Sequence, residues 1–232
     1  MKDASTRPIS ARKHAAVLAA AKHSFMSLGF TATNLDEVAR AAGVSKMTIY
    51  SHFDSKENLF TQVLEAVVAE RSRRGPALDA DVDASMLPQA LTDIAIDLVE
   101  TVEDQEIVQL RRILIAEQAR YPLPAATWRR NTVLTAVNSL AQFFERLQQR
   151  RLLTDLDPLE AASQFLWMLI GDRLDAMLLD PRETLTSPRQ HAAGVVRVFL
   201  AAHLGHPTSA GEDTQDRRRS SDRQLWLGEQ SL

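Results

Sequence analysis

Apolar residues recur at helical spacing along almost the whole chain, and no run alternates between apolar and polar residues as a half-buried strand would. Helix-breaking residues are sparse, because the 232 residues include only eight glycines and nine prolines. The sequence therefore predicts an all-α protein of about nine long helices. Their expected ranges are 9–29, 35–42, 46–52, 56–74, 86–103, 105–120, 124–150, 158–180 and 188–204.

Two breaks divide this pattern. Gly75-Pro76 is a strong helix boundary, and the Asp- and Ala-rich residues 76–85 that follow predict a loop. From Gly205 onward the polar composition is typical of a disordered tail. A short apolar cluster around Trp226 interrupts the tail, and whether it is ordered stays open.

Composition excludes several classes of protein. The absence of cysteine rules out disulfide frameworks, cysteine zinc sites and thiol redox sensing. No apolar stretch approaches the ~20 residues of a membrane span, and the first residues lack a signal-peptide core, so we expect no membrane association and a cytoplasmic location. Phosphate loops, GxSxG and HExxH are missing and the histidines are scattered, so we expect no enzyme, no metal site and no cofactor.

The net charge of −3 is unevenly distributed. Residues 1–56 hold eight Lys or Arg against four acids, and the remainder holds 19 against 26. A basic end on an acidic body is typical of a nucleic-acid footprint at that end, although short segments also vary by a few charges without functional meaning.

Residues 34–53 carry the pattern of a helix-turn-helix. Asn34 followed by Glu37 is typical of a capping box, which starts a helix at Leu35. Gly43 can take the left-handed conformation that ends this helix, and Ser45 is a good N-cap for the next one. In such a unit the second helix enters the DNA major groove with its N-terminal end first.

The expected DNA-facing residues follow from the helical spacing. Ile49 and Phe53 are four residues apart and should face the core. The side chains left for the groove are those of Lys46, Met47, Thr48, Tyr50 and His52. Lys46 could reach a guanine edge and Met47 a thymine methyl, whereas the hydroxyls suit phosphate.

A second capping box is expected at Asp54 and Glu57. It would start the next helix so that Lys56 lies in its first turn, beside the same DNA backbone.

The residues that follow resemble the N-terminal signature of the TetR family of transcription regulators. They are Phe25, Gly29-Phe30, Thr33, Val38-Ala39, Ala42-Gly43-Val44-Ser45, Thr48-Ile49-Tyr50, His52-Phe53, Lys56-Glu57 and Leu59. The resemblance implies a three-helix DNA-binding head, a fourth helix that links it to the body, and a two-fold dimer. It also implies phosphate contacts by Thr33, Thr48, Tyr50, His52 and Lys56, and base contacts by Lys46. Together with the capping residues, the candidate DNA-binding set is Thr33, Asn34, Ser45, Lys46, Met47, Thr48, Tyr50, His52 and Lys56.

Asp36 departs from the family pattern, since many relatives carry a basic residue there. A carboxylate at this position would be repelled by phosphate, so we expect it to favour the positive end of its helix instead. DNA contact by residues 35–42 would then depend mainly on Thr33 and Asn34. The alternative is that Asp36 accepts from a cytosine amino group.

The expected organisation is a flexible N-terminus over 1–8, a DNA-binding domain over 9–56, a connecting helix over 57–75, a ligand-binding and dimerisation domain over 76–204, and the tail over 205–232. Within the body, residues 110–122 resemble the AefR-like subclass of TetR C-terminal domains.

Dimerisation is expected through the helices at 158–180 and 188–204, whose apolar stripes are wide enough to pack inward and against a partner. The alternative is that both stripes are ordinary core. The interface candidates are Leu166, Ile170, Leu174, Met177, Val195 and Phe199.

An effector pocket is expected in the body, mainly apolar with a few polar groups. The candidates are Ile94, Leu98, Leu110, Trp128, Asn131, Phe144, Trp167 and Met168, although for any one of them plain core packing is the more common explanation. Arg111 and Arg112 could anchor an anionic ligand, but a solvated face or a salt bridge explains them as well.

The sequence thus predicts a ligand-responsive regulator that binds double-stranded DNA as a homodimer and is released from its operator by a small-molecule effector. Repression is the family norm, and activation is the alternative. An architectural DNA-binding protein is remote, since it would require a far more basic chain than one of pI about 6.1.

Overall fold

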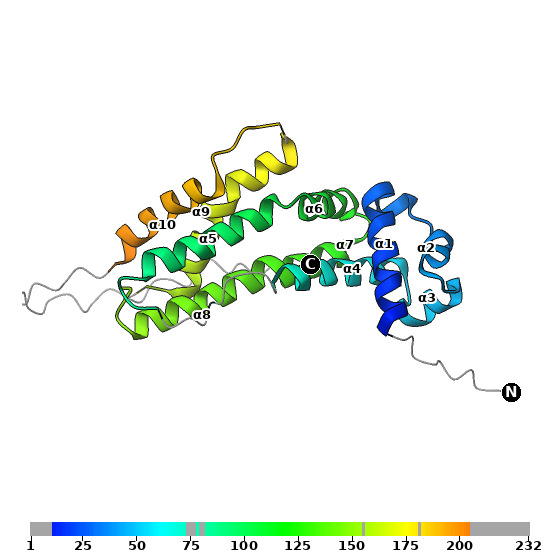
Figure 1. Ribbon diagram of the computed structural model, residues 1–232, viewed down its shortest axis with the longest axis horizontal. Helices are drawn as coiled ribbons and strands as arrows, with labels where there is room; N and C mark the ends of the chain where they lie inside the picture. The colour runs from blue at the N-terminus through cyan, green and yellow to red at the C-terminus, as the bar shows by residue number, and fades with distance from the viewer. Residues whose placement is uncertain (1–10, 73–77, 79–81, 155, 181, 205–232) are drawn as a thin grey trace, which may run out of the picture.

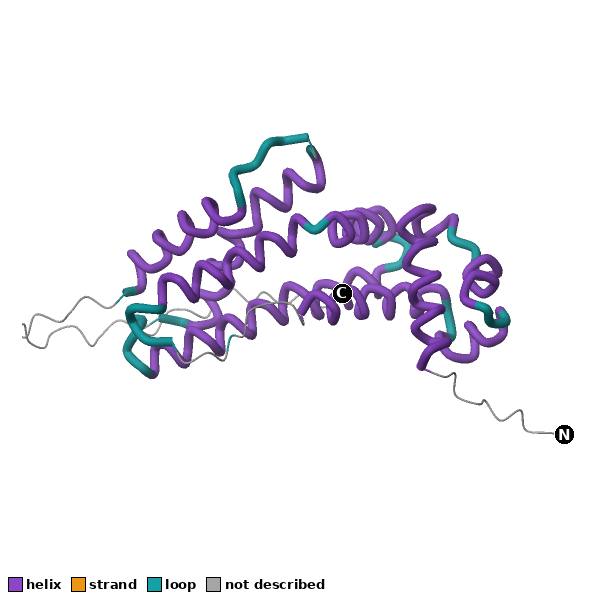
Figure 2. The backbone as a smooth tube through the Cα atoms, viewed as in Figure 1, coloured by secondary structure: helices purple, strands orange, loops and turns teal. Residues whose placement is uncertain are grey.

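A computed structural model describes residues 11–72, 78, 82–154, 156–180 and 182–204, and within these ranges all regular structure is helical (Figures 1 and 2). The helices are α1 (Ala11–Ala32), α2 (Leu35–Ala42), α3 (Lys46–Phe53), α4 (Lys56–Ser72), α5 (Leu87–Glu103), α6 (Gln105–Glu117), α7 (Pro122–Arg129), the π-helix η1 (Arg130–Leu134), α8 (Thr135–Gln149), α9 (Pro158–Leu179) and α10 (Pro188–His203). Since α7, η1 and α8 follow one another without a gap, the predicted all-α fold of about nine helices is confirmed.

The end of α1 differs from the prediction. Gly29 was expected to stop the helix, but its φ of 78° kinks the chain and helical structure resumes as far as Ala32. The kink turns Phe30 into the core, where it is 2% exposed and stacks on Phe25. Leu28, which was expected on the buried face, is instead 52% exposed because Phe30 takes that place.

The helix-turn-helix forms with Asn34, Gly43 and Ser45 as its caps, as predicted, but Glu37 pairs with Arg40 at 3.8 Å in place of closing a capping box with Asn34. The Asn34 carboxamide accepts from the Asp36 N–H at 2.8 Å and so begins α2. Gly43 ends α2 in the left-handed conformation (φ 65°), and the Ser45 hydroxyl accepts from the Thr48 N–H at 3.1 Å to begin α3.

The predicted capping box at Asp54 and Glu57 is wrong by one residue. Asp54 has a φ of 61° and ends α3, with its N–H donating to the Tyr50 carbonyl. Ser55 begins α4 instead, because its hydroxyl accepts from the Asn58 N–H at 3.1 Å. The tight turn leaves Asp54 on the α3 side and Ser55 in the capping position.

The described residues form two hydrophobic cores. The first joins α1–α4 with residues of α6 and α7, including Ile107, Leu114 and Trp128. The second is built from α5, α8, α9 and α10 around Phe144, Phe165 and Phe199. In Figure 1 the head, α1–α3, lies at the right, and α10 lies toward the opposite end.

Several expectations fall on residues that the structure does not describe: the N-terminus over 1–8, much of the loop over 76–85, and the tail with Trp226. Among the described helices, none combines the length and the apolar character that a membrane crossing requires.

Candidate DNA interface and ligand cavity

One face of α3 is buried and the other is open to solvent. Ile49 and Phe53 are each 1% exposed and pack in the head, as predicted. Met47 is 75% exposed and Tyr50 41%. Of the other predicted DNA-binding residues on this helix and its cap, Ser45 and Lys46 are exposed, and Thr48 and His52 are half-buried.

The N-terminal turn of α3 is suited to an anion. It contains no acidic residue of its own, and the Ser45 and Thr48 hydroxyls lie 2.8 Å apart at its start. The positive end of the helix dipole and these hydroxyls favour a phosphate, while the Asp36 carboxylate of α2, which pairs with Lys46, opposes it in part.

Thr33 and Asn34 are occupied within the head. Thr33 is 4% exposed, and its hydroxyl donates to the Gly29 carbonyl at 2.7 Å, so it closes the end of α1. Asn34 is exposed but is the N-cap of α2. The structure therefore gives Thr33 a structural hydrogen bond in place of a surface-facing hydroxyl.

Lys46 is paired across the turn. Its ammonium donates to the Asp36 carboxylate at 2.9 Å, and both side chains are about half exposed. The hydrogen bond and charge of Asp36 raise the pKa of Lys46. Sequence reasoning assigned Asp36 to the helix dipole and missed this pair, which joins residues ten apart through the turn at Gly43.

Lys56 is fastened to the end of α1. Its ammonium donates to the Thr31 carbonyl at 3.0 Å and lies 4.9 Å from the centre of the Phe30 ring. Partial burial lowers its pKa. Lys56 thus supports the head while standing in the first turn of α4.

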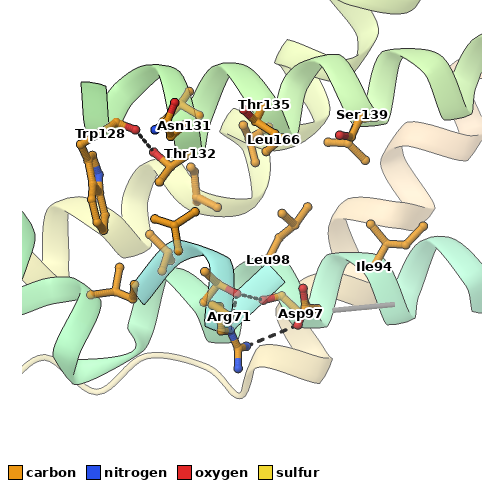
Figure 3. A pocket seen from close by; sticks show the side chains of 18 of the residues that line it. Arg71, Ile94, Asp97, Leu98, Trp128, Asn131, Thr132, Thr135, Ser139 and Leu166 are labelled. Carbon is orange, nitrogen blue, oxygen red and sulfur yellow. Dashed lines mark hydrogen bonds and ion pairs between the residues drawn. The ribbon is translucent and has the colours of Figure 1, made fainter. Parts of the chain in front are cut away.

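A cavity of about 340 Å³ lies between the two cores (Figure 3). It is lined by side chains from α4 to α9, including Val68, Ile94, Leu98, Ile107, Arg111, Trp128, Asn131, Ser139 and Leu166. Because α4, α6 and α7 pack with the head, a molecule in the cavity would contact both cores at once.

Four of the eight predicted pocket residues line this cavity: Ile94, Leu98, Trp128 and Asn131. The other four lie elsewhere. Leu110 and Phe144 are both 0% exposed in the first and second core respectively, and Trp167 and Met168 face outward at 47% and 40% exposure.

The π-helix η1 forms part of the cavity wall. Its wider turn brings Asn131, Thr132 and Val133, which follow one another in sequence, to the same cavity, and Thr135 joins them. In a regular α-helix, consecutive residues point about 100° apart. Short π segments of this kind occur frequently at functional sites.

An ion pair joins α4 to α5 at the cavity wall. Arg71 lies 3.4 Å from the Asp97 carboxylate and donates to the Thr101 hydroxyl at 2.8 Å (Figure 3). Burial raises the pKa of Asp97, and the charge of Arg71 opposes this shift. The connecting helix therefore takes part in the cavity, which the spacing of its apolar residues did not indicate.

Three polar contacts join α6 to α1. Lys22 pairs with Glu106 at 2.8 Å, and the Thr31 hydroxyl donates to Glu117 at 2.8 Å. Between them, Gln109 donates to the Met26 carbonyl. We call these contacts the α1–α6 seam. The helix that carries Ile107 and Arg111 at the cavity therefore also contacts the head.

The solvent-exposed surface of α9 and α10, here called their outer face, carries several apolar side chains. They are Leu159, Trp167, Met168, Leu179 and Val198, each at least 40% exposed. Of the predicted interface residues, Leu166, Ile170 and Phe199 are buried in the chain's own core, and Leu174, Met177 and Val195 are half-buried.

A helix-turn-helix head on a helical body, with a cavity between their two cores, is the architecture of a DNA-binding regulator, and two family models match the chain. Residues 17–63 match the bacterial regulatory proteins of the tetR family, and residues 89–203 match the C-terminal domain of the AefR-like transcriptional repressors.

Known relatives agree with these models. The flavonoid-responsive regulator FrrA is 33% identical, with a TM-score of 0.72 over 84% of this chain and 98% of FrrA. The transcriptional regulator RutR of Escherichia coli K12 is 41% identical over 63 residues, which are 27% of this chain and only 29% of RutR. The transcriptional activator FasR of Mycolicibacterium smegmatis is 45% identical over 49 residues, or 21% of this chain and 22% of FasR.

The chain belongs to the TetR family of transcription regulators. The predicted resemblance is thereby confirmed, and so is the prediction of a regulator in place of an enzyme.

Proposed function

We propose that the chain is a ligand-responsive repressor that binds a palindromic operator as a dimer and leaves it when a small molecule fills the cavity. The observation that carries this proposal is the position of the cavity between the core of the head and the core of the body. A ligand there contacts helices that pack against the DNA-binding head, so its binding can change the position of the head.

The exposed face of α3 is the proposed reading surface. Lys46 and Met47 stand at its N-terminal end, where base edges are contacted in helix-turn-helix proteins. Ser45, Thr48, Tyr50 and His52 supply hydroxyl and imidazole donors for the flanking phosphates, with Lys56 beside them. This division assigns sequence preference to two residues and general affinity to the others.

The dimer is proposed to form through the outer face of α9 and α10. The exposed Trp167, Met168 and Val198 supply the apolar area that a stable interface needs, while Leu166, Ile170 and Phe199 would support it from beneath. Two heads are required because a single recognition helix makes few contacts, whereas two can read major grooves about 34–36 Å apart.

Release would occur by a population shift. Ligand in the cavity contacts Val68 and Arg71 of α4 and Ile107 and Arg111 of α6, all on helices that pack with the head. A ligand that binds better when these helices are displaced favours that conformer, in which the spacing of the two heads no longer fits the operator.

The test is selection of bound sequences from random duplex DNA, followed by titration of the selected duplex and a scrambled duplex at two salt concentrations. A palindrome bound by dimers, and preferred clearly over the scrambled duplex, is the expected result. Binding that only weakens with salt, with no enriched palindrome, contradicts the proposal of a specific regulator.

Activation is the second candidate, and the curated activator FasR among the relatives favours keeping it. Transcription in vitro from a promoter that carries the selected operator separates the two. A repressor lowers transcript yield when added without effector, and an activator raises it.

A further inference from the structure

Two nitrogen donors at the cavity have no partner. Arg111 Nη1 of α6 and Trp128 Nε1 of α7 are buried, and neither forms a hydrogen bond within the described part of the chain. Both side chains line the cavity, and in Figure 3 the Trp128 ring extends from its helix toward the facing helices. A buried N–H without an acceptor is destabilising, so these two positions call for one.

The threonines at the cavity already form hydrogen bonds within the chain. The Thr132 and Thr135 hydroxyls donate to the carbonyls of Trp128 and Arg130, at 2.8 and 3.0 Å. The Thr101 hydroxyl donates to the Asp97 carbonyl at 2.7 Å. Arg111 Nη1 and Trp128 Nε1 are therefore the buried donors at the cavity that still lack a hydrogen-bond acceptor in the part of the chain that the structure describes.

The charge at the cavity also favours an anionic ligand, because one positive charge is not compensated. Its ionisable lining residues are Arg71, Asp97 and Arg111, and the first two neutralise each other at 3.4 Å. Arg111 is left without a counter-ion among the described residues, and burial lowers its pKa. The neighbouring Arg112 differs, because it is exposed and donates to the Met177 carbonyl at 2.6 Å.

We propose that the effector is a mainly apolar small molecule with one carboxylate, whose oxygens accept from Arg111 and Trp128 while its apolar part fills the space beside Ile94, Leu98 and Leu166. This inference rests on the proposed function, since it names the ligand class of the same cavity.

A carboxylate fits better than the other acidic groups. It is fully ionised at neutral pH, whereas a phenol of ordinary pKa near 10 is not and would leave the Arg111 charge uncompensated. It also offers two oxygens, which suits donors from two different helices. A phosphate would bring more charge than one unpaired arginine can balance.

The test is calorimetric titration of the full chain with matched acids and amides: 1-naphthoate against 1-naphthamide, and octanoate against octanamide. Each pair has the same apolar part and differs in the charge. At least one acid is expected to bind more than about tenfold tighter than its amide, the range for charge-assisted hydrogen bonds to a buried group.

Three variants test which residues cause the preference for the acid over the amide. Arg111→Gln should abolish the preference for the acid, and Trp128→Phe should reduce it partly because one donor remains. Arg129→Gln is the matched control, since it removes the same charge from an exposed neighbour on α7. A thermal melt of each variant establishes that the fold is kept. For Arg111→Gln, the midpoint should be at or above that of the unmodified chain.

The proposal is overturned if no acid binds more tightly than its amide, or if Arg111→Gln keeps the full preference. The same titrations in the presence of the selected operator separate this inference from the proposed function. An amide that binds and releases the operator as well as its acid refutes the carboxylate and leaves the ligand response intact. An acid that binds through Arg111 without releasing the operator supports the site and refutes the proposed response.

Discussion

The Asp36 carboxylate and the Lys46 ammonium form a 2.9 Å ion pair that joins the start of α2 to the start of α3. Because both side chains are about half exposed, solvent screens the pair and it adds little to folding stability, so Lys46 can exchange the Asp36 carboxylate for a DNA base at little cost. In the free protein the pair lowers the positive potential of the reading surface, which weakens attraction to DNA of any sequence.

Asp36→Asn should therefore strengthen binding to operator and scrambled duplex by the same factor and leave the ratio between the two affinities unchanged. Lys46→Ala should instead relax base preference, by ~1–3 kcal/mol if Lys46 contacts a base. Fluorescence titration of both duplexes at two salt concentrations measures both effects. Equal losses on both duplexes for Lys46→Ala would refute its base-reading role.

Tyr50→Phe tests the phosphate contacts. The side chain is 41% exposed, so removing the hydroxyl leaves the fold unchanged but removes one donor to the DNA backbone. The expected loss is about 0.5–1.5 kcal/mol on operator and scrambled duplex equally. A loss confined to the operator would mean that Tyr50 reads sequence.

Lys56→Ala should likewise weaken binding to both duplexes, but here the structure adds a second effect. Since Lys56 also holds the Thr31 carbonyl and lies over Phe30, the melting temperature should fall together with DNA affinity. A variant with unchanged stability and reduced binding would show that these internal contacts are unimportant.

The helix-turn-helix could be predicted almost to the residue because its determinants are local. Gly43 must take a left-handed conformation, and Ser45 caps the next turn whatever the rest of the chain does. The cap of α4 was predicted at Asp54 and lies at Ser55, because the two residues are adjacent and either side chain can cap a helix. Only the backbone of the turn decides between them.

The cavity was only half predictable, and for a different physical reason. Helical spacing indicates that Leu110 and Phe144 face inward, but not which of two cores receives them. Helical spacing also does not indicate which of the adjacent residues Leu166 and Trp167 is buried, and in the structure Leu166 is buried and Trp167 is exposed. Such assignments depend on contacts between distant helices, as does the Arg71–Asp97 pair.

The α1–α6 seam is expected to transmit the effector signal. Glu117→Gln weakens the contact with the Thr31 hydroxyl while leaving the cavity intact, so an acid that releases the operator from the unmodified chain should still bind but release it less completely. The measurement is the ratio of operator affinities with and without that acid. Glu145→Gln, an exposed position on α8, is the control, and an equal effect there would contradict a specific role for the seam.

The outer face of α9 and α10 can be tested by charge. Trp167→Glu should convert a dimer into a monomer in sedimentation and lower operator affinity, because the two heads are no longer linked. Since Trp167 is 47% exposed, folding of the single chain should be little affected. Leu123→Glu, at a 56% exposed position on α7, should leave the dimer intact. A dimer that survives Trp167→Glu would place the interface elsewhere.

The pH dependence of stability should carry the signature of Asp97. Burial raises its pKa above 3.8 in the folded chain, so in the window just above that value the folded state holds a proton that the unfolded state has lost. The contribution of Asp97 to stability must therefore fall as pH rises through this window and become constant above the folded pKa.

Urea unfolding of the unmodified chain and of Asp97→Asn, compared at a series of pH values, isolates that contribution as a difference. The advantage of the unmodified chain over the variant should shrink as pH rises from about 4 and then level off. Asp93→Asn, one turn earlier on the exposed side of α5, is the control and should give no such decline. A difference that grows with pH would mean that Arg71 outweighs burial and stabilises the Asp97 carboxylate.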